Sequence, residues 1–79
     1  MIIKILGSGC PNCKMLEANT RKALEDKGLQ ADVLKVTDYA DISAYGIMRT
    51  PGLVIDEKVM SAGRVLSPQE ISRILEGLV

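Results

Sequence analysis

The chain has 79 residues, of which 47% are hydrophobic, and this suits one compact domain near the lower size limit for a single hydrophobic core. Its ten basic and ten acidic residues cancel to a formal charge of +0, and only 3% of the residues are aromatic. A chain without net charge has no positive electrostatic field to attract phosphates or anionic membranes, and one with so few aromatic side chains offers little for nucleic-acid bases to stack on. We therefore expect no nucleic-acid or membrane partner.

Residues 2–6 and 11–27 predict a strand followed by a helix. The stretch IIKIL is aliphatic and ends at GSG, which is typical of a short buried strand that runs into a loop. From Cys10 onward the apolar residues recur with helical spacing, and Gly28 stands where a residue in left-handed conformation would end the helix. The residues that share one helical face are Cys13, Leu16, Thr20, Ala23 and Leu24.

A second strand and a short helix are predicted next. The stretch ADVLKV, residues 31–36, follows a helix of suitable length, and this indicates a βαβ unit with parallel strands. Thr37 or Asp38 can cap a short helix that runs through Tyr45 and ends at Gly46.

The last third of the chain predicts a hairpin and a final helix. Residues 52–56 and 58–62 are too close together for a crossover, so we expect an antiparallel hairpin that turns near Glu57, with a turn type that its residues leave open. In SPQE, Ser67 and Glu70 form a capping box around a proline at the first helical position. The apolar stripe of this helix consists of Ile71, Ile74, Leu75 and Leu78.

Two cysteines, Cys10 and Cys13, stand two residues apart in GCPNCK and are the only ones in the chain. A structural zinc site needs four ligands, and the chain has no histidine. Covalent haem attachment would need a histidine at the position of Lys14. A catalytic cysteine-histidine pair is also excluded, because the chain has no histidine to act as the base. A disulfide that closes so short a loop would restrain the unfolded chain little. Redox exchange and binding of a soft ion such as Cu(I) therefore remain.

The predicted position of the pair suits redox exchange. Cys10 would lie at a helix N-terminus, where free N–H groups and the helix dipole favour the thiolate, and Lys14 would add a positive charge. Cys13 would lie on the first turn of the same helix, within reach of a mixed disulfide at Cys10 and turned toward the interior.

GCPNCK before a helix, followed by YGIMRTPGLVID before a hairpin and a final helix, resembles the thioredoxin-like superfamily over nearly the whole chain, and the size resembles its compact glutaredoxin-like members. The predicted elements form one α/β domain over residues 1–79 in the order β-α-β-α-β-β-α. The resemblance implies a thioredoxin-like fold with a four-stranded mixed sheet flanked by three helices. It also implies that Cys10 attacks, that Cys13 resolves, and that a cis peptide bond joins Thr50 to Pro51. The residues expected to contact the substrate are Pro11, Asn12, Thr50 and Pro51.

The implied function is that of a thiol-disulfide oxidoreductase in electron transport and cell redox homeostasis. It would need no cofactor or metal, would exchange electrons with protein or small-molecule disulfides, and would be served by a reductase. We expect a cytoplasmic protein, because Lys4 interrupts the apolar N-terminus and no long apolar run follows. We also expect it to be a monomer. The chain departs from the family pattern at two places. Lys4 stands at the spacing before Cys10 where thioredoxins carry a buried acid. The paired glycines and the acid that help glutaredoxins hold glutathione are not found in SAGRV.

The alternative is a Cu(I)-binding or chaperone domain that uses the same two thiolates. Small copper-binding domains also carry C-x-x-C in the first strand-to-helix loop. Their pattern has methionine where this chain has Ser8, and their order β-α-β-β-α-β ends on a strand.

Overall fold

Three helices and four strands follow one another in the expected order in the computed structural model, which describes residues 1–78. The elements are β1 (Ile2–Leu6), α1 (Pro11–Lys27), β2 (Asp32–Val36), α2 (Tyr39–Ala44), β3 (Gly52–Ile55), β4 (Lys58–Ala62) and α3 (Pro68–Leu78). The order ends on a helix, which matches the thioredoxin-like expectation and differs from the order of copper-binding domains. No helix within residues 1–78 is long and apolar enough to cross a membrane.

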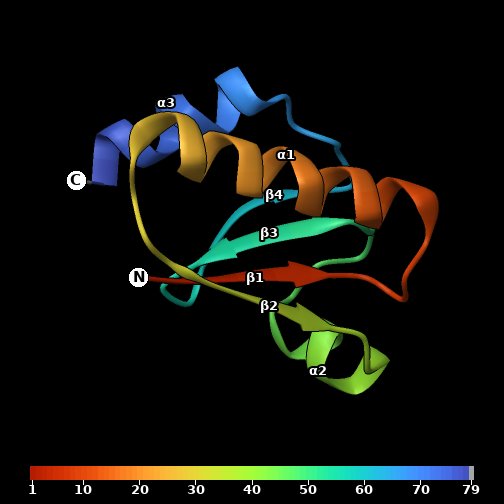
Figure 1. The fold of residues 1–79 in the computed structure, drawn as a ribbon. Coiled ribbons are helices and arrows are strands. Elements are labelled where there is room, and N and C mark those ends of the chain that lie inside the picture. The colour runs from red at the N-terminus through yellow and green to blue at the C-terminus, as the bar shows by residue number, and fades with distance from the viewer. Residues whose placement is uncertain (79) are drawn as a thin grey trace.

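The strands form one mixed sheet in the order β2-β1-β3-β4. β1 and β2 are parallel, as a βαβ unit requires, and the other two pairings are antiparallel. Figure 1 shows α1 and α3 side by side over one face of the sheet and α2 against the other face. The predicted four-stranded mixed sheet flanked by three helices is confirmed.

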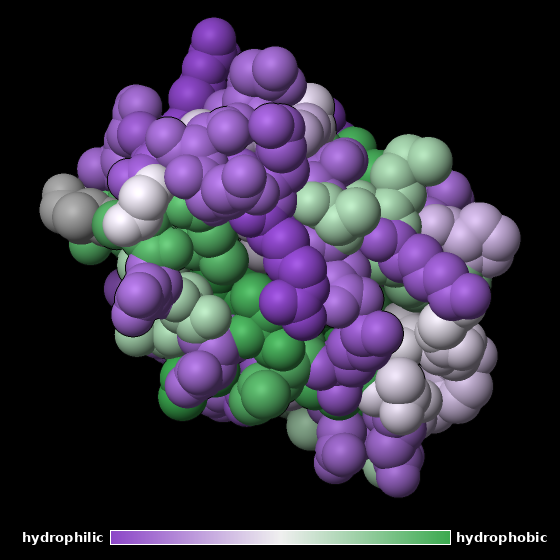
Figure 2. Space-filling view, viewed as in Figure 1, coloured by the Kyte–Doolittle hydropathy of each residue, from purple (hydrophilic) through white to green (hydrophobic). Residues whose placement is uncertain are grey.

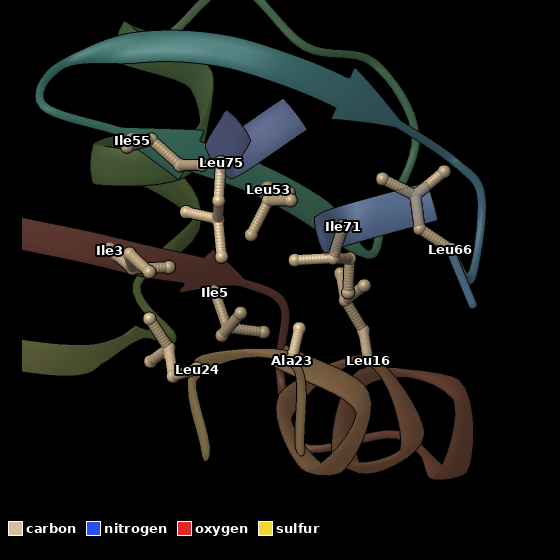
Figure 3. Close-up of a cluster of buried hydrophobic side chains, with 10 residues drawn as sticks. All are labelled: Ile3, Ile5, Leu16, Ala23, Leu24, Leu53, Ile55, Leu66, Ile71 and Leu75. Atoms are coloured by element: carbon tan, nitrogen blue, oxygen red, sulfur yellow. The ribbon is translucent and has the colours of Figure 1, made fainter. Parts of the chain in front are cut away.

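The main hydrophobic core lies between the sheet and the pair α1 and α3 (Figure 3). Ile3 and Ile5 of β1 point into it because alternate residues of a strand face the same side. Leu16 of α1 and Leu75 of α3 meet them with no exposed surface, and burying each such side chain contributes about 1.5–3 kcal/mol. The cluster comprises Ile3, Ile5, Leu16, Ala23, Leu24, Leu53, Ile55, Leu66, Ile71 and Leu75.

The opposite face of the sheet is covered only in part. Ile42 of α2 packs on Leu6 and Val54 in a second, smaller cluster. Because α2 has only 6 residues, it leaves apolar side chains on this side exposed, among them Leu34 at 48%. Figure 2 shows hydrophobic surface below the layer of α1 and α3, around the β2 edge of the sheet.

The local signals predict most of the helix ends, although α2 ends at Ala44 with Tyr45 as its C-cap, one residue earlier than expected. Gly28 ends α1 in left-handed conformation with φ 66°. Of the two candidate caps of α2 it is Asp38 that acts, since its side chain accepts the N–H of Ala40 at 2.8 Å. The capping box of α3 is formed, because the N–H of Glu70 donates to Ser67 Oγ at 3.1 Å and the N–H of Ser67 donates to Glu70 Oε1 at 3.2 Å.

Candidate active site

The cysteine pair lies at the junction of β1 and α1, where the structure joins Cys10 and Cys13 in a disulfide. Their Cα atoms are 5.1 Å apart, within the range that a disulfide spans. The loop before the junction is hydrogen-bonded to α2, since the Tyr39 hydroxyl donates to Ser8 Oγ at 3.3 Å. The cysteine pair thus lies between the end of β1 and the first turn of a long helix, and a contact with α2 supports the loop that precedes it.

Cys10 is itself the N-cap of α1. Its backbone is extended, and its Sγ accepts the N–H of Cys13 at 3.2 Å, as a capping oxygen would. The backbone N–H of Lys14 donates to the Cys10 carbonyl at 3.0 Å and begins the helical ladder. This position gives the sulfur of Cys10 a direct donor and the positive end of the helix dipole, both of which favour a thiolate over a thiol.

Cys13 lies in a different environment, one turn further along α1. It is only 4% exposed, while Cys10 is partly exposed. Burial in apolar surroundings disfavours a charged sulfur. The two sulfurs therefore differ in access and in the form that their surroundings favour, which suits one thiol that attacks and one that resolves.

The Thr50–Pro51 peptide bond is cis, as the resemblance implied. Pro51 is buried immediately before β3, and Thr50 before it is exposed. Thr50 and Cys13 both lie close to Gly7, which brings the loop before β3 next to the disulfide. Two of the four expected substrate contacts thus lie beside the cysteines, and the other two, Pro11 and Asn12, are exposed on the first turn of α1.

A charged pair near Cys13 was not expected from the sequence. Glu17 lies one turn beyond Cys13 on α1, with Oε1 3.1 Å from Lys35 Nζ and Oε2 3.0 Å from Arg21. The hydrogen bond from Lys35, with a smaller contribution from Arg21, lowers the pKa of the Glu17 carboxyl. Both Glu17 and Lys35 line a cavity of about 50 Å³ that Cys13 also lines. The sequence shows the Glu17 and Arg21 spacing, but the contact with β2 depends on the tertiary fold.

Lys4, at the spacing of the thioredoxin acid, points to the other face of the sheet. Its ammonium group lies 2.7 Å from the hydroxyl of Tyr45 and 2.5 Å from Oε1 of Glu57. The hydrogen bonds that Lys4 donates to Glu57 and Tyr45 raise the pKa of Lys4, and the bond to Glu57 lowers the pKa of that carboxyl. Since its neighbours Ile3 and Ile5 face α1, Lys4 lies on the side of β1 away from the helix that carries the cysteines.

Within residues 1–78, no group of three or more His, Cys, Asp or Glu side chains is placed to hold a metal ion. Soft-ion binding would therefore have to depend on the two sulfurs of Cys10 and Cys13, which are bonded to each other here. In this form the pair is an oxidised dithiol.

The chain is similar to thioredoxins along nearly its whole length. The family model described as a thioredoxin domain matches residues 1–76. A thioredoxin of Methanothermobacter thermautotrophicus is 41% identical over 75 residues, which cover 95% of this chain and 97% of that relative. A thioredoxin of Methanocaldococcus jannaschii is 36% identical over 76 residues, which cover 96% of this chain and 87% of that relative.

A solved structure of a malarial protein has the same fold, with a TM-score of 0.69 over 96% of this chain and 93% of that chain. The two sequences are 14% identical, so this likeness concerns the fold alone.

Proposed function

The chain belongs to the thioredoxin family and is a thiol-disulfide oxidoreductase, and on that premise we propose that Cys10 and Cys13 exchange electrons with the disulfides of other molecules. The observation that carries the proposal is the cap of α1, where Cys10 Sγ accepts the N–H of Cys13 at 3.2 Å. That donor remains available to a Cys10 thiolate, which is the species that attacks a disulfide.

The exchange proceeds in two steps. The Cys10 thiolate attacks one sulfur of the substrate disulfide, forming a mixed disulfide and releasing the other substrate sulfur as a thiolate. Cys13 then loses its proton and attacks Cys10 Sγ, which forms the Cys10–Cys13 disulfide and releases the second substrate sulfur. Two electrons have passed to the substrate, whose two released thiolates become thiols by taking up the proton that Cys13 loses and one that Cys10 lost when it formed the thiolate.

Substrate contacts are proposed at the two segments that border the disulfide. Thr50 is exposed beside Gly7 and Cys13, and we expect its backbone to pair with an extended substrate segment next to the sulfurs. Pro51, buried behind it, holds that backbone in place, while Pro11 and Asn12 present the exposed turn between the cysteines. The substrate is a disulfide of a protein or a small molecule, and a separate reductase returns the pair to the dithiol.

The test is reduction of a protein disulfide such as that of insulin, with dithiothreitol as the electron source. We expect the purified protein to accelerate the reaction over dithiothreitol alone and Cys10→Ser to abolish the acceleration. Ser72→Ala, at a half-buried position of α3, is the matched control and should keep full activity. A wild-type protein that gives no acceleration, or a Cys10→Ser variant that keeps it, would overturn the proposal.

A further inference from the structure

Gly7, at the end of β1, lies directly against the sulfur of Cys13. A Cβ placed on Gly7 with ideal geometry would overlap Cys13 Sγ and would lie 3.3 Å from Cys13 Cβ. The nearest atom of any other residue, Thr50 Cβ, would be 3.7 Å away, which is ordinary van der Waals contact. The overlap therefore involves Cys13 and, above all, its sulfur.

The backbone of Gly7 does not itself require glycine. The glycines of this chain with positive φ are Gly9, Gly28, Gly46 and Gly63, and Gly7 is not among them. Its N–H donates to the Val36 carbonyl at 2.9 Å, a bond that an L-residue in an extended conformation could also make. What excludes a side chain at position 7 is thus the space that the Cys13 sulfur occupies.

The sulfur occupies that space under different constraints in the two redox forms. In the disulfide, the bond to Cys10 fixes Cys13 Sγ over Gly7. In the dithiol, the Cys13 side chain can turn about its Cα–Cβ bond to another rotamer, and the cavity of about 50 Å³ that it lines with Gly7 and Lys35 offers room. A side chain at position 7 would therefore oppose the disulfide more strongly than the dithiol.

We propose that Gly7 is a positioning residue that sets the balance between the disulfide and the dithiol of Cys10 and Cys13. By leaving space for Cys13 Sγ within bonding reach of Cys10, it favours the disulfide and makes the dithiol a stronger reductant. Oxidation breaks two S–H bonds and forms one S–S bond. The two electrons and two protons pass to a partner disulfide, which becomes two thiols.

The inference rests on the proposed function and is tested by titrating wild type and Gly7→Ala in buffers of reduced and oxidised dithiothreitol. The oxidised fraction is measured by mass after alkylation of free thiols. We expect Gly7→Ala to shift the equilibrium toward the dithiol by about tenfold, the lower end for an overpacked site, equivalent to about 30 mV for a two-electron couple. If the midpoint of the redox titration is the same for Gly7→Ala and wild type, or if the equilibrium shifts toward the disulfide, the inference is overturned.

Two controls separate this effect from a general loss of stability. Gly77→Ala adds a Cβ that meets nothing within 4 Å, and Leu75→Val weakens the main core between α3 and the sheet. Both variants should leave the midpoint of the redox titration unchanged, although Leu75→Val should lower the melting temperature of the disulfide form and of the dithiol form. If wild type itself shows no reversible two-electron couple, the proposed function fails, whereas a normal wild type with an unshifted Gly7→Ala refutes only the role of Gly7.

A Gly7→Ala protein that does not fold is also informative when it is combined with Cys13→Ala, which removes the sulfur that the new Cβ would meet. We expect the double variant to fold and its melting temperature to approach that of Cys13→Ala alone. A double variant as unstable as Gly7→Ala would show that the clash lies elsewhere, which overturns the inference.

Discussion

The ammonium group of Lys4 in β1 lies 2.5 Å from a carboxylate oxygen of Glu57, which belongs to the turn between β3 and β4. The hydroxyl of Tyr45, at the end of α2, lies 2.7 Å from the same ammonium group and 3.2 Å from the other Glu57 oxygen. Three separate segments of the chain thus meet on the face of the sheet that α2 leaves partly open.

Glu57→Gln should lower the melting temperature by a few degrees at pH 7, because it removes the charge that pairs with Lys4. The pKa of Glu57 lies below its ordinary value of 4.5, so its contribution is present above that value and is lost as the pH falls through the folded pKa. The difference from wild type should therefore close toward pH 3. The raised pKa of Lys4 means that its own contribution persists up to at least its ordinary value of 10.5.

Melting curves from pH 3 to pH 9 measure this difference, with Glu25→Gln on the exposed surface of α1 as the control. The Glu25→Gln curve should follow that of wild type at each pH. A Glu57→Gln difference that stays constant down to pH 3 would rule out the pairing as its cause.

The hairpin turn should tolerate asparagine at position 56 but not alanine. Asp56 and Glu57 have φ values of 48° and 69°, and Asp56 Oδ1 accepts the N–H of Ile2 at 2.8 Å. Asparagine keeps an acceptor oxygen and adopts positive φ readily, whereas alanine loses the hydrogen bond and is strained. Asp56→Ala should lower the free energy of unfolding by about 1–3 kcal/mol, and Asp56→Asn should leave it unchanged or raise it.

Urea denaturation measures both variants, and Lys58→Ala, on the exposed start of β4, controls for changes at the hairpin surface. Equal losses for Asp56→Ala and Lys58→Ala would show that the turn conformation is not the cause.

The sequence predicts those elements whose ends carry a local signal. Gly28 and the pair of Ser67 and Glu70 act through backbone groups within a few residues, so α1 ends and α3 begins where expected. The hairpin turn lacks such a signal, because Asp56 and Glu57 are held at positive φ with contacts to β1 more than fifty residues away. No local pattern contains that information.

The same distinction applies to the candidate site. The spacing of Cys10 and Cys13 at a strand-to-helix junction is local, and the cis bond before Pro51 followed from the resemblance. The contact of Gly7 with the Cys13 sulfur joins the end of a strand to a helix and emerges only when both are placed. The contact of Glu17 with Lys35 has the same origin, because it crosses from α1 to β2.

The capping box of α3 should make a measurable contribution to stability. Ser67→Ala removes the oxygen that accepts the N–H of Glu70 at 3.1 Å and should lower the free energy of unfolding by about 1 kcal/mol. Ser72→Ala, inside the same helix, replaces serine with a better helix former and should cost nothing. Urea denaturation at pH 7 compares the two, and a larger loss for Ser72→Ala would exclude the cap as the source.

The two cysteines should differ in acidity because α1 surrounds them differently. Cys10 caps the helix, and its sulfur accepts the N–H of Cys13 at 3.2 Å, whereas Cys13 is only 4% exposed. Alkylation of Cys13→Ser, which retains Cys10, should therefore show a pH midpoint below the free-cysteine value of about 8.5. Cys10→Ser, which retains Cys13, should react slowly and with a midpoint that is not lowered.

The difference in acidity has a consequence for turnover that can be measured with a small disulfide substrate. Cys13→Ser should form a mixed disulfide at Cys10 and accumulate it, because the thiol that would release the substrate is gone, while Cys10→Ser should form none. Mass spectrometry of both variants after exposure to the substrate distinguishes the two outcomes, and unfolded protein provides the reference rate for each thiol. If Cys13 is the more acidic and the faster to react, then Cys10 is the resolving thiol and the order of steps proposed here is reversed.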